Sequence, residues 1–238
     1  MMLRKVVLLM MTIIILIGVS GCMNKNTGSK PSVKDFMMQH MEEKYNEKFE
    51  FVNINTETWT SSFTEMILSS EKYPGGRILV HKYNGTDLIE DNYVDFLMKT
   101  KIEEAVGKIV AEIYPKSKVF YSAGGKPLPN RVNVDMSIED YSKETITGLV
   151  LSICVGDPDY KNNKDEKLEK LRLILEEKKY YSRLDIFYIK EGKLELINDD
   201  NWYETLTGPS HAEWIHLAGF FSMDDSYKFT YSEWRDIK

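Results

Sequence analysis

The chain has 238 residues, of which 31 are Lys or Arg and 37 are Asp or Glu, and 42% of the residues are hydrophobic. This acidic balance argues against a nucleic-acid-binding protein, which needs a basic surface to release counterions from phosphates, and against electrostatic adhesion to anionic lipids. The hydrophobic content is ordinary for a globular protein, and the length suffices for one large domain or two small ones.

The first 22 residues have the pattern of a secretory signal. Arg4 and Lys5 precede an apolar run over residues 6–19, and the run is followed by Ser20, Gly21 and Cys22. This segment resembles the signal and lipobox of bacterial lipoproteins. The resemblance implies cleavage between Gly21 and Cys22 and a diacylglyceryl group on the Cys22 thiol. An uncleaved membrane anchor is the alternative, but crossing a bilayer takes about 20 apolar residues.

The resemblance also predicts where the mature protein resides. Two or three acyl chains would hold Cys22 stably at the extracytoplasmic face of the cell membrane. Removing residues 1–21 leaves 29 basic and 37 acidic residues, a formal charge of −8. The polar segment 22–32 is expected to be a flexible tether, and residues 33–238 to be the folded domain. The chain is also similar to uncharacterised lipoproteins of low-GC Gram-positive bacteria, through the signal and through the stretch from Phe36 to Val52.

The first half of the domain predicts a helix followed by an antiparallel meander. Apolar residues at spacings of three and four indicate a helix over residues 33–46. Asn84-Gly85 predicts a hairpin with a type I′ turn, and Pro74-Gly75-Gly76 predicts another turn. The expected strands cover residues 49–54, 62–70, 78–83 and 87–90.

A long amphipathic helix is predicted over residues 91–114. Asp91 or Asn92 can cap its first turn, and Pro115 would end it. Its apolar stripe is expected to pack against a sheet.

The second half alternates strands and helices. Strands are expected at 119–122, 132–134 and 149–155, with a short helix that begins after Ser137 and a charged helix over 165–181. Residues 184–189 and 194–197 are expected to form a hairpin around Glu191-Gly192. A strand, a crossover helix and a second strand indicate a βαβ unit. The predicted fold class is therefore α+β, with possible lobes over 33–115 and 116–238.

Several fragments look like chemical motifs but fail on spacing or context. Gly124-Gly125-Lys126 lacks the remaining residues of a phosphate-binding loop. His211 and His216 are five residues apart, whereas two helical zinc ligands need a spacing of four. The acidic segment 157–165 lacks the glycine of a calcium loop and is expected to be a solvated loop. Cys154 lies in an apolar run and is expected to be an inert core thiol. We expect no metal, no cofactor and no catalytic residue.

The C-terminal segment is rich in aromatic residues. Trp202, Trp214 and Trp234 are candidate ligand-binding residues, since aromatic rings beside acidic residues can stack on sugar rings or hold a peptide. Completion of the core is the alternative, and the one we favour.

The leading hypothesis is a non-enzymatic, membrane-anchored lipoprotein that binds an envelope protein, a peptide or a glycan. Two alternatives remain. One is a lipid-anchored hydrolase of wall glycan or peptide, whose two carboxylates need not be close in sequence. The other is a small solute-binding lipoprotein.

Overall fold

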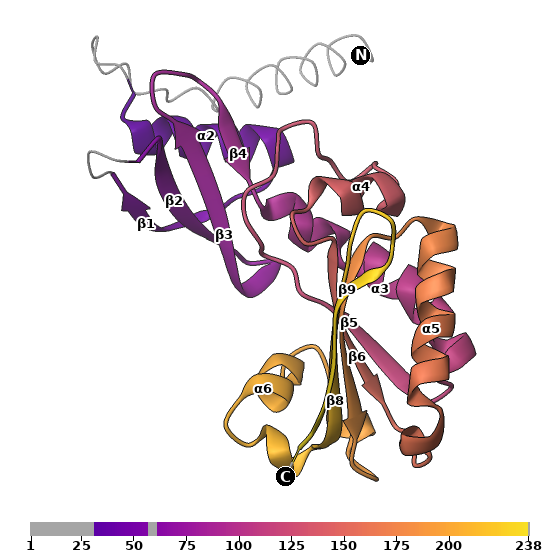
Figure 1. The fold of residues 1–238 in the computed structure, drawn as a ribbon. Helices are drawn as coiled ribbons and strands as arrows, with labels where there is room; N and C mark the ends of the chain where they lie inside the picture. The colour runs from indigo at the N-terminus through magenta and orange to yellow at the C-terminus, as the bar shows by residue number, and fades with distance from the viewer. Residues whose placement is uncertain (1–30, 57–60, 238) are drawn as a thin grey trace, which may run out of the picture. The chain divides into compact units, whose positions relative to one another are not determined.

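An antiparallel meander forms the first of two sheets, in a computed structural model that describes residues 31–56 and 61–237. Its four strands are hydrogen-bonded in chain order, and every neighbouring pair is antiparallel (Figure 1). This confirms the predicted meander. The strands are β1 (Glu50–Asn55), β2 (Phe63–Ser70), β3 (Tyr73–Tyr83) and β4 (Ile89–Asp91).

Two turn predictions in this sheet are wrong in detail. The chain does turn at Asn84-Gly85, but only Gly85 has a positive φ, of 74°. Five residues, 84–88, separate β3 from β4, and a loop of that length does not need a type I′ turn. Pro74-Gly75-Gly76 lies inside β3.

Helix α2 (Val33–Tyr45) precedes the meander, as the sequence predicts. Ser32 caps its start, since its hydroxyl accepts a hydrogen bond of 3.1 Å from the amide of Asp35. Met37 and Met41 are fully buried. Residues 37–238 form one compact unit, to which both methionines belong.

Helix α3 (Tyr93–Ile113) follows β4 and matches the predicted long helix. The carboxylate of Asp91 accepts a hydrogen bond of 2.9 Å from the amide of Tyr93, so Asp91 is the side chain that caps the first turn. The apolar stripe of the helix is buried, at Val94, Met98, Ile102, Val106, Val110 and Ile113.

The second sheet has five strands in the order β5-β6-β7-β8-β9. Only β6 and β7 are parallel, and helix α5 (Tyr160–Lys178) connects them, which confirms the predicted βαβ unit. The other pairs are antiparallel. The strands are β5 (Ser117–Tyr121), β6 (Leu149–Val155), β7 (Ser182–Ile189), β8 (Ile215–Met223) and β9 (Phe229–Asp236).

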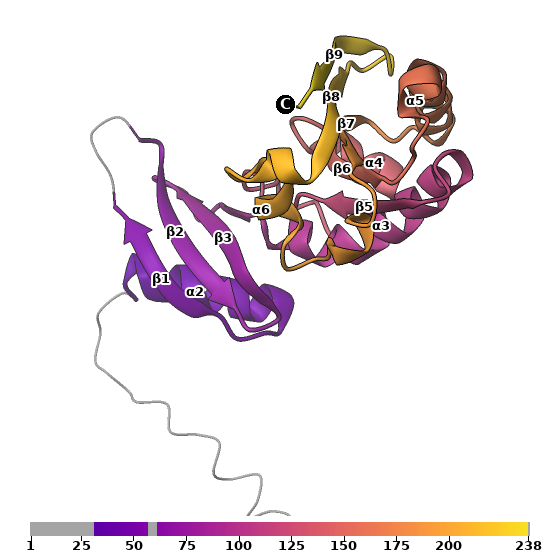
Figure 2. The same ribbon diagram turned by 90° about the horizontal axis from the view of Figure 1, so that it is seen from below.

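Helices cover both faces of this second sheet. Helices α3 and α5 pack against one face, where Leu151, Ile186 and Leu217 belong to the larger apolar core (Figure 2). Helix α6 (Trp202–Thr207) and the short 3-10 helices η1 (Leu194–Leu196) and η2 (His211–Glu213) lie toward the other. Helix α4 (Ile138–Glu144) begins after Ser137, whose hydroxyl accepts from the amide of Asp140 as predicted.

The predicted hairpin over residues 184–197 is wrong. Residues 194–196 form η1, and β8 is the antiparallel neighbour of β7, so the hairpin of this lobe is β8–β9. A 3-10 turn aligns residues three apart, and Leu194 and Ile197 are both buried while Leu196 is 59% exposed. An alternating strand would instead place Leu194 and Leu196 on one face.

Two other boundaries also differ. The predicted strand at 132–134 is irregular, with Val132 buried and Val134 exposed, although a strand would place both on the same side. Helix α5 begins at Tyr160, so the second half of the acidic segment 157–165 is helical. The overall class is α+β.

The lipobox residues Gly21 and Cys22 lie outside the described residues. No helix in the described part of the chain is long and apolar enough to cross a membrane.

Candidate ligand-binding pocket on the second sheet

A pocket of about 330 Å³ lies between α6 and the face of the second sheet opposite α3 and α5. Its inner wall is apolar, formed by the buried residues Phe187, Leu206, Ile215 and Ala218. Polar and aromatic side chains line the rest. They include Ser152, Arg183 and Asp185 on β6 and β7, Trp202, Tyr203 and Thr207 on α6, Phe220 and Arg235 on β8 and β9, and also Ser122 and His211. Concave sites with an apolar wall and a few convergent polar groups are typical of ligand pockets.

The register of the strands explains why these side chains converge. Ser152 on β6 is paired with Asp185 on β7, and Asp185 is paired with Phe220 on β8. Paired residues point to the same face of a sheet, so the three side chains form a row across it. Arg183 stands two residues before Asp185 on β7 and therefore faces the same way.

Asp185 has the most unusual environment of the row. Its side chain is 15% exposed, and burial raises the pKa of its carboxyl above the ordinary value of 3.8, with Arg183 opposing the shift. The contacts to the Arg183 guanidinium are long, at 3.4 and 3.5 Å. Charge-assisted bonds of this kind normally measure about 2.7–2.9 Å. The carboxylate therefore keeps capacity to accept hydrogen bonds from a ligand.

The Asp185 carboxylate is expected to lower the stability of the folded protein at neutral pH. A carboxyl whose pKa is raised in the folded state destabilises above that pKa, and the cost disappears as the pH falls below the ordinary value of 3.8. Asp185→Asn should therefore raise the melting temperature by about 2–4 °C at pH 7, as expected for a gain of about 1 kcal/mol. Calorimetry should show the difference shrinking toward pH 4. A variant that is less stable than the parent at pH 7 would contradict this assignment.

The three candidate tryptophans do not form one site. Trp202 lines the pocket and stacks on Phe120, with ring centroids 5.5 Å apart. Trp214 packs against the apolar cluster on this face of the sheet, which includes Phe187 and Leu206. The ammonium of Lys193 lies 5.0 Å from the Trp214 ring. Trp234 packs on the opposite face, over Gly219, and its indole N–H donates to Asp165.

The acidic residues near the aromatic segment also have other roles. Asp199 accepts from the ammonium of Lys99 at 2.7 Å, and Asp224 accepts from the amides of Ser226 and Lys228 in the turn before β9. Asp185 lines the pocket together with the rings of Trp202 and Tyr203, and it was not among the predicted site residues. The alternation of Arg183, Asp185 and Phe187 along a predicted strand was the available signal, because it places two charges on one face of a strand inside the sheet.

The structure places the fragments that resemble chemical motifs in definite surroundings. The amides of Gly124 and Gly125 donate to the carboxylate of Asp95, at 2.7 and 2.9 Å, so they cannot cradle a phosphate. Cys154 is fully buried in β6, and burial raises the pKa of its thiol to about 12. His211 lies in η2 and His216 in β8. Within the described residues, no cluster of His, Cys, Asp and Glu could hold a metal ion.

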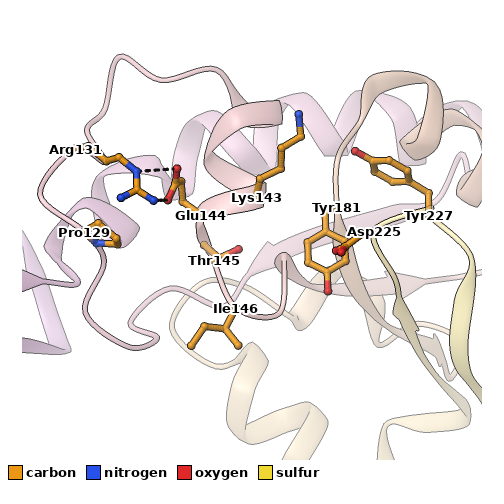
Figure 3. Close-up of a pocket in the computed structure, with 9 residues that line it drawn as sticks. All are labelled: Pro129, Arg131, Lys143, Glu144, Thr145, Ile146, Tyr181, Asp225 and Tyr227. Carbon is orange, nitrogen blue, oxygen red and sulfur yellow. Dashed lines mark hydrogen bonds and ion pairs between the residues drawn. The ribbon is translucent and has the colours of Figure 1, made fainter.

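A larger cavity of about 680 Å³ lies beside the end of α4. Figure 3 shows Arg131 and Glu144 on one wall, where they pair through two contacts of 2.6 and 3.1 Å. The Arg131 side chain is 69% exposed, and such pairs at the surface are already satisfied by each other. Tyr181 and Asp225 lie on the other wall. Glu144 in this cavity is 21% exposed, but its carboxylate is already held by Arg131 at 2.6 Å, whereas the contacts of Asp185 to Arg183 are long.

Comparisons with known proteins add only a distant likeness. No protein-family model matches the sequence, and no curated protein matches it significantly. A crystal structure of a DUF5037 family protein from Ruminococcus gnavus is similar, with a TM-score of 0.42 and 12% sequence identity. The match covers 83% of this chain and 94% of that one.

Proposed function

We propose that the protein is a lipoprotein anchored to the extracytoplasmic face of the cell membrane through acyl chains on Cys22, and that its α+β domain acts by binding. The observation that carries the anchor is the sequence of the first 22 residues. An apolar run of 14 residues after two basic residues is too short to span a bilayer, and it is followed by Ser20, Gly21 and Cys22.

The pocket beneath α6 supports the binding role. Its apolar wall, its aromatic rings and the loosely paired carboxylate of Asp185 are the features of a ligand site. A polar tether over residues 22–32 would reach roughly 15–20 Å on average and would give the domain access to envelope components near the membrane.

The anchor is tested by replacing Cys22 with Ala in the full-length protein in a Gram-positive host. The parent should incorporate labelled palmitate and fractionate with membranes, and Cys22→Ala should lose the label. Cys154→Ala is the matched control, because it removes the other cysteine of the chain, and it should label like the parent. Mass spectrometry of the mature N-terminus distinguishes the lipid anchor from an uncleaved membrane-spanning anchor. Lipidation gives a chain that begins at Cys22, whereas an uncleaved anchor keeps residues 1–21. A Cys22→Ala variant that still incorporates palmitate would overturn the proposal.

A further inference from the structure

Arg183, Asp185 and Arg235 are the charged lining residues of the pocket beneath α6, and each has an oppositely charged neighbour on its own strand. Arg183 is paired with Asp185 on β7, and Arg235 is paired with Glu233 on β9, at 2.7 and 2.8 Å. Glu233 is the strand partner of Phe220, so it stands in the same row as Asp185. A ligand with a net charge would have to compete with one of these internal pairs, whereas a neutral polar ligand would not.

Because the Arg183–Asp185 contact is long, both side chains can form hydrogen bonds with a ligand group that donates and accepts hydrogen bonds. A hydroxyl has one donor and two acceptor positions, a carboxylate only accepts, and a guanidinium only donates. A ligand hydroxyl can therefore donate to Asp185 while a neighbouring hydroxyl accepts from Arg183. Burial around Asp185, whose side chain is 15% exposed, strengthens the bond to its carboxylate relative to the same bond in open water.

Aromatic rings stand beside these polar groups. Trp202 is held by its stack on Phe120, and Tyr203 lies perpendicular to Trp202, with ring centroids 5.6 Å apart. Tyr203 is 63% exposed although it lines the pocket, so its ring is available as a platform at the rim. Flat apolar rings of this kind pack against the C–H faces of a pyranose.

We propose that this pocket binds a neutral saccharide, which stacks on Tyr203 and places adjacent hydroxyls on Asp185 and Arg183. This deepens the proposed binding role and rests on it. The cavity of about 330 Å³ is near the small end of ligand pockets, which span roughly 300–1,000 Å³, so it would hold one end of a longer glycan.

The test is isothermal titration of the full-length lipidated protein in a zwitterionic detergent, because glycoside detergents would compete for the site. The probes are tri-N-acetylchitotriose and maltotriose, which separate an acetylated amino sugar from a plain glucose polymer. Glucose 6-phosphate serves as a probe with a net charge, and the dipeptide D-alanyl-D-alanine, a zwitterion without net charge, serves as a peptide probe. We expect saturable binding of at least one trisaccharide at one site, and no binding of glucose 6-phosphate or of the dipeptide.

Two substitutions locate the site. Tyr203→Ala should weaken binding about 3- to 10-fold through loss of the stack, and Asp185→Ala should weaken it about 10-fold or more through loss of a charged acceptor. Phe51→Ala is the control, since it removes an exposed ring from β1 in the other sheet and should leave affinity unchanged. Circular dichroism establishes that each variant is folded.

The proposal fails if neither trisaccharide binds, if glucose 6-phosphate or the dipeptide binds instead, or if folded Tyr203→Ala and Asp185→Ala both keep the affinity of the parent. These outcomes are independent of the Cys22 test, because a protein that is lipidated but binds no saccharide leaves the anchor intact.

Discussion

Asp95→Ala is expected to lower the free energy of unfolding by about 3–5 kcal/mol, the range seen when one partner of a buried charged network is removed. Asp95 is 4% exposed and accepts four hydrogen bonds. The hydroxyls of Tyr121 and Tyr141 donate to one carboxylate oxygen, and the amides of Gly124 and Gly125 donate to the other. Alanine would leave two buried phenols and two amides without this acceptor, and each unsatisfied donor costs about 1–3 kcal/mol.

Urea unfolding, followed by circular dichroism, measures this loss. Glu104→Ala is the matched control, because Glu104 is an exposed acid on the same helix, and its removal should change stability by less than about 0.5 kcal/mol. An Asp95→Ala variant that loses less than about 1 kcal/mol would show that the tyrosines and the glycine loop find other partners.

Asp91→Ala should cost about 3 kcal/mol for a related reason. The Asp91 side chain is fully buried, and it accepts from the ammonium of Lys44 at 2.7 Å and from the hydroxyl of Tyr45 at 2.6 Å. It also caps α3 through the amide of Tyr93. The substitution therefore removes an ion pair, a hydrogen bond and a helix cap together, and a lost cap alone typically costs about 1 kcal/mol.

Asp87→Ala, an exposed acid in the preceding loop, is the control for Asp91 and should be nearly neutral in the same urea titration. A double-mutant cycle with Lys44→Met isolates the ion pair, which should show a coupling of at least about 1 kcal/mol. Additive effects of the two substitutions would contradict the assigned pair.

Hydrophobic periodicity was enough to predict most of the elements. The long stripe of α3 and the apolar run of β6 were unambiguous, because both the spacing and the flanking residues agreed. The wrong predictions concern segments whose secondary structure depends on a contact with a strand elsewhere in the chain. Residues 194–197 are as apolar as a short strand, but the edge of β7 is occupied by β8, which arrives about twenty residues later in the chain. The residues of this segment alone do not indicate which strand pairs with β7.

The candidate pocket was predictable only in part. The aromatic richness around Trp202 pointed to the correct region, but it could not separate rings that line a pocket from rings that fill a core. Asp185 and Arg183 come from a strand far from α6 in the sequence, and the pairing of β7 with both β6 and β8 brings them beneath it. The site depends on the register in which β6, β7 and β8 pair, and this register could not be predicted from the sequence.

Asp91 and Asp95 stand about one helical turn apart, and each reaches a different part of the chain. Asp91 holds Lys44 and Tyr45 at the end of α2, while Asp95 holds Tyr121 and Tyr141 beside the second sheet. The start of α3 therefore joins the two halves into one cooperative unit. A cut near residue 115 would leave Asp91 with Lys44 and Tyr45 but would separate Asp95 from all four of its donors, so the Asp95 network is lost when the halves are expressed alone.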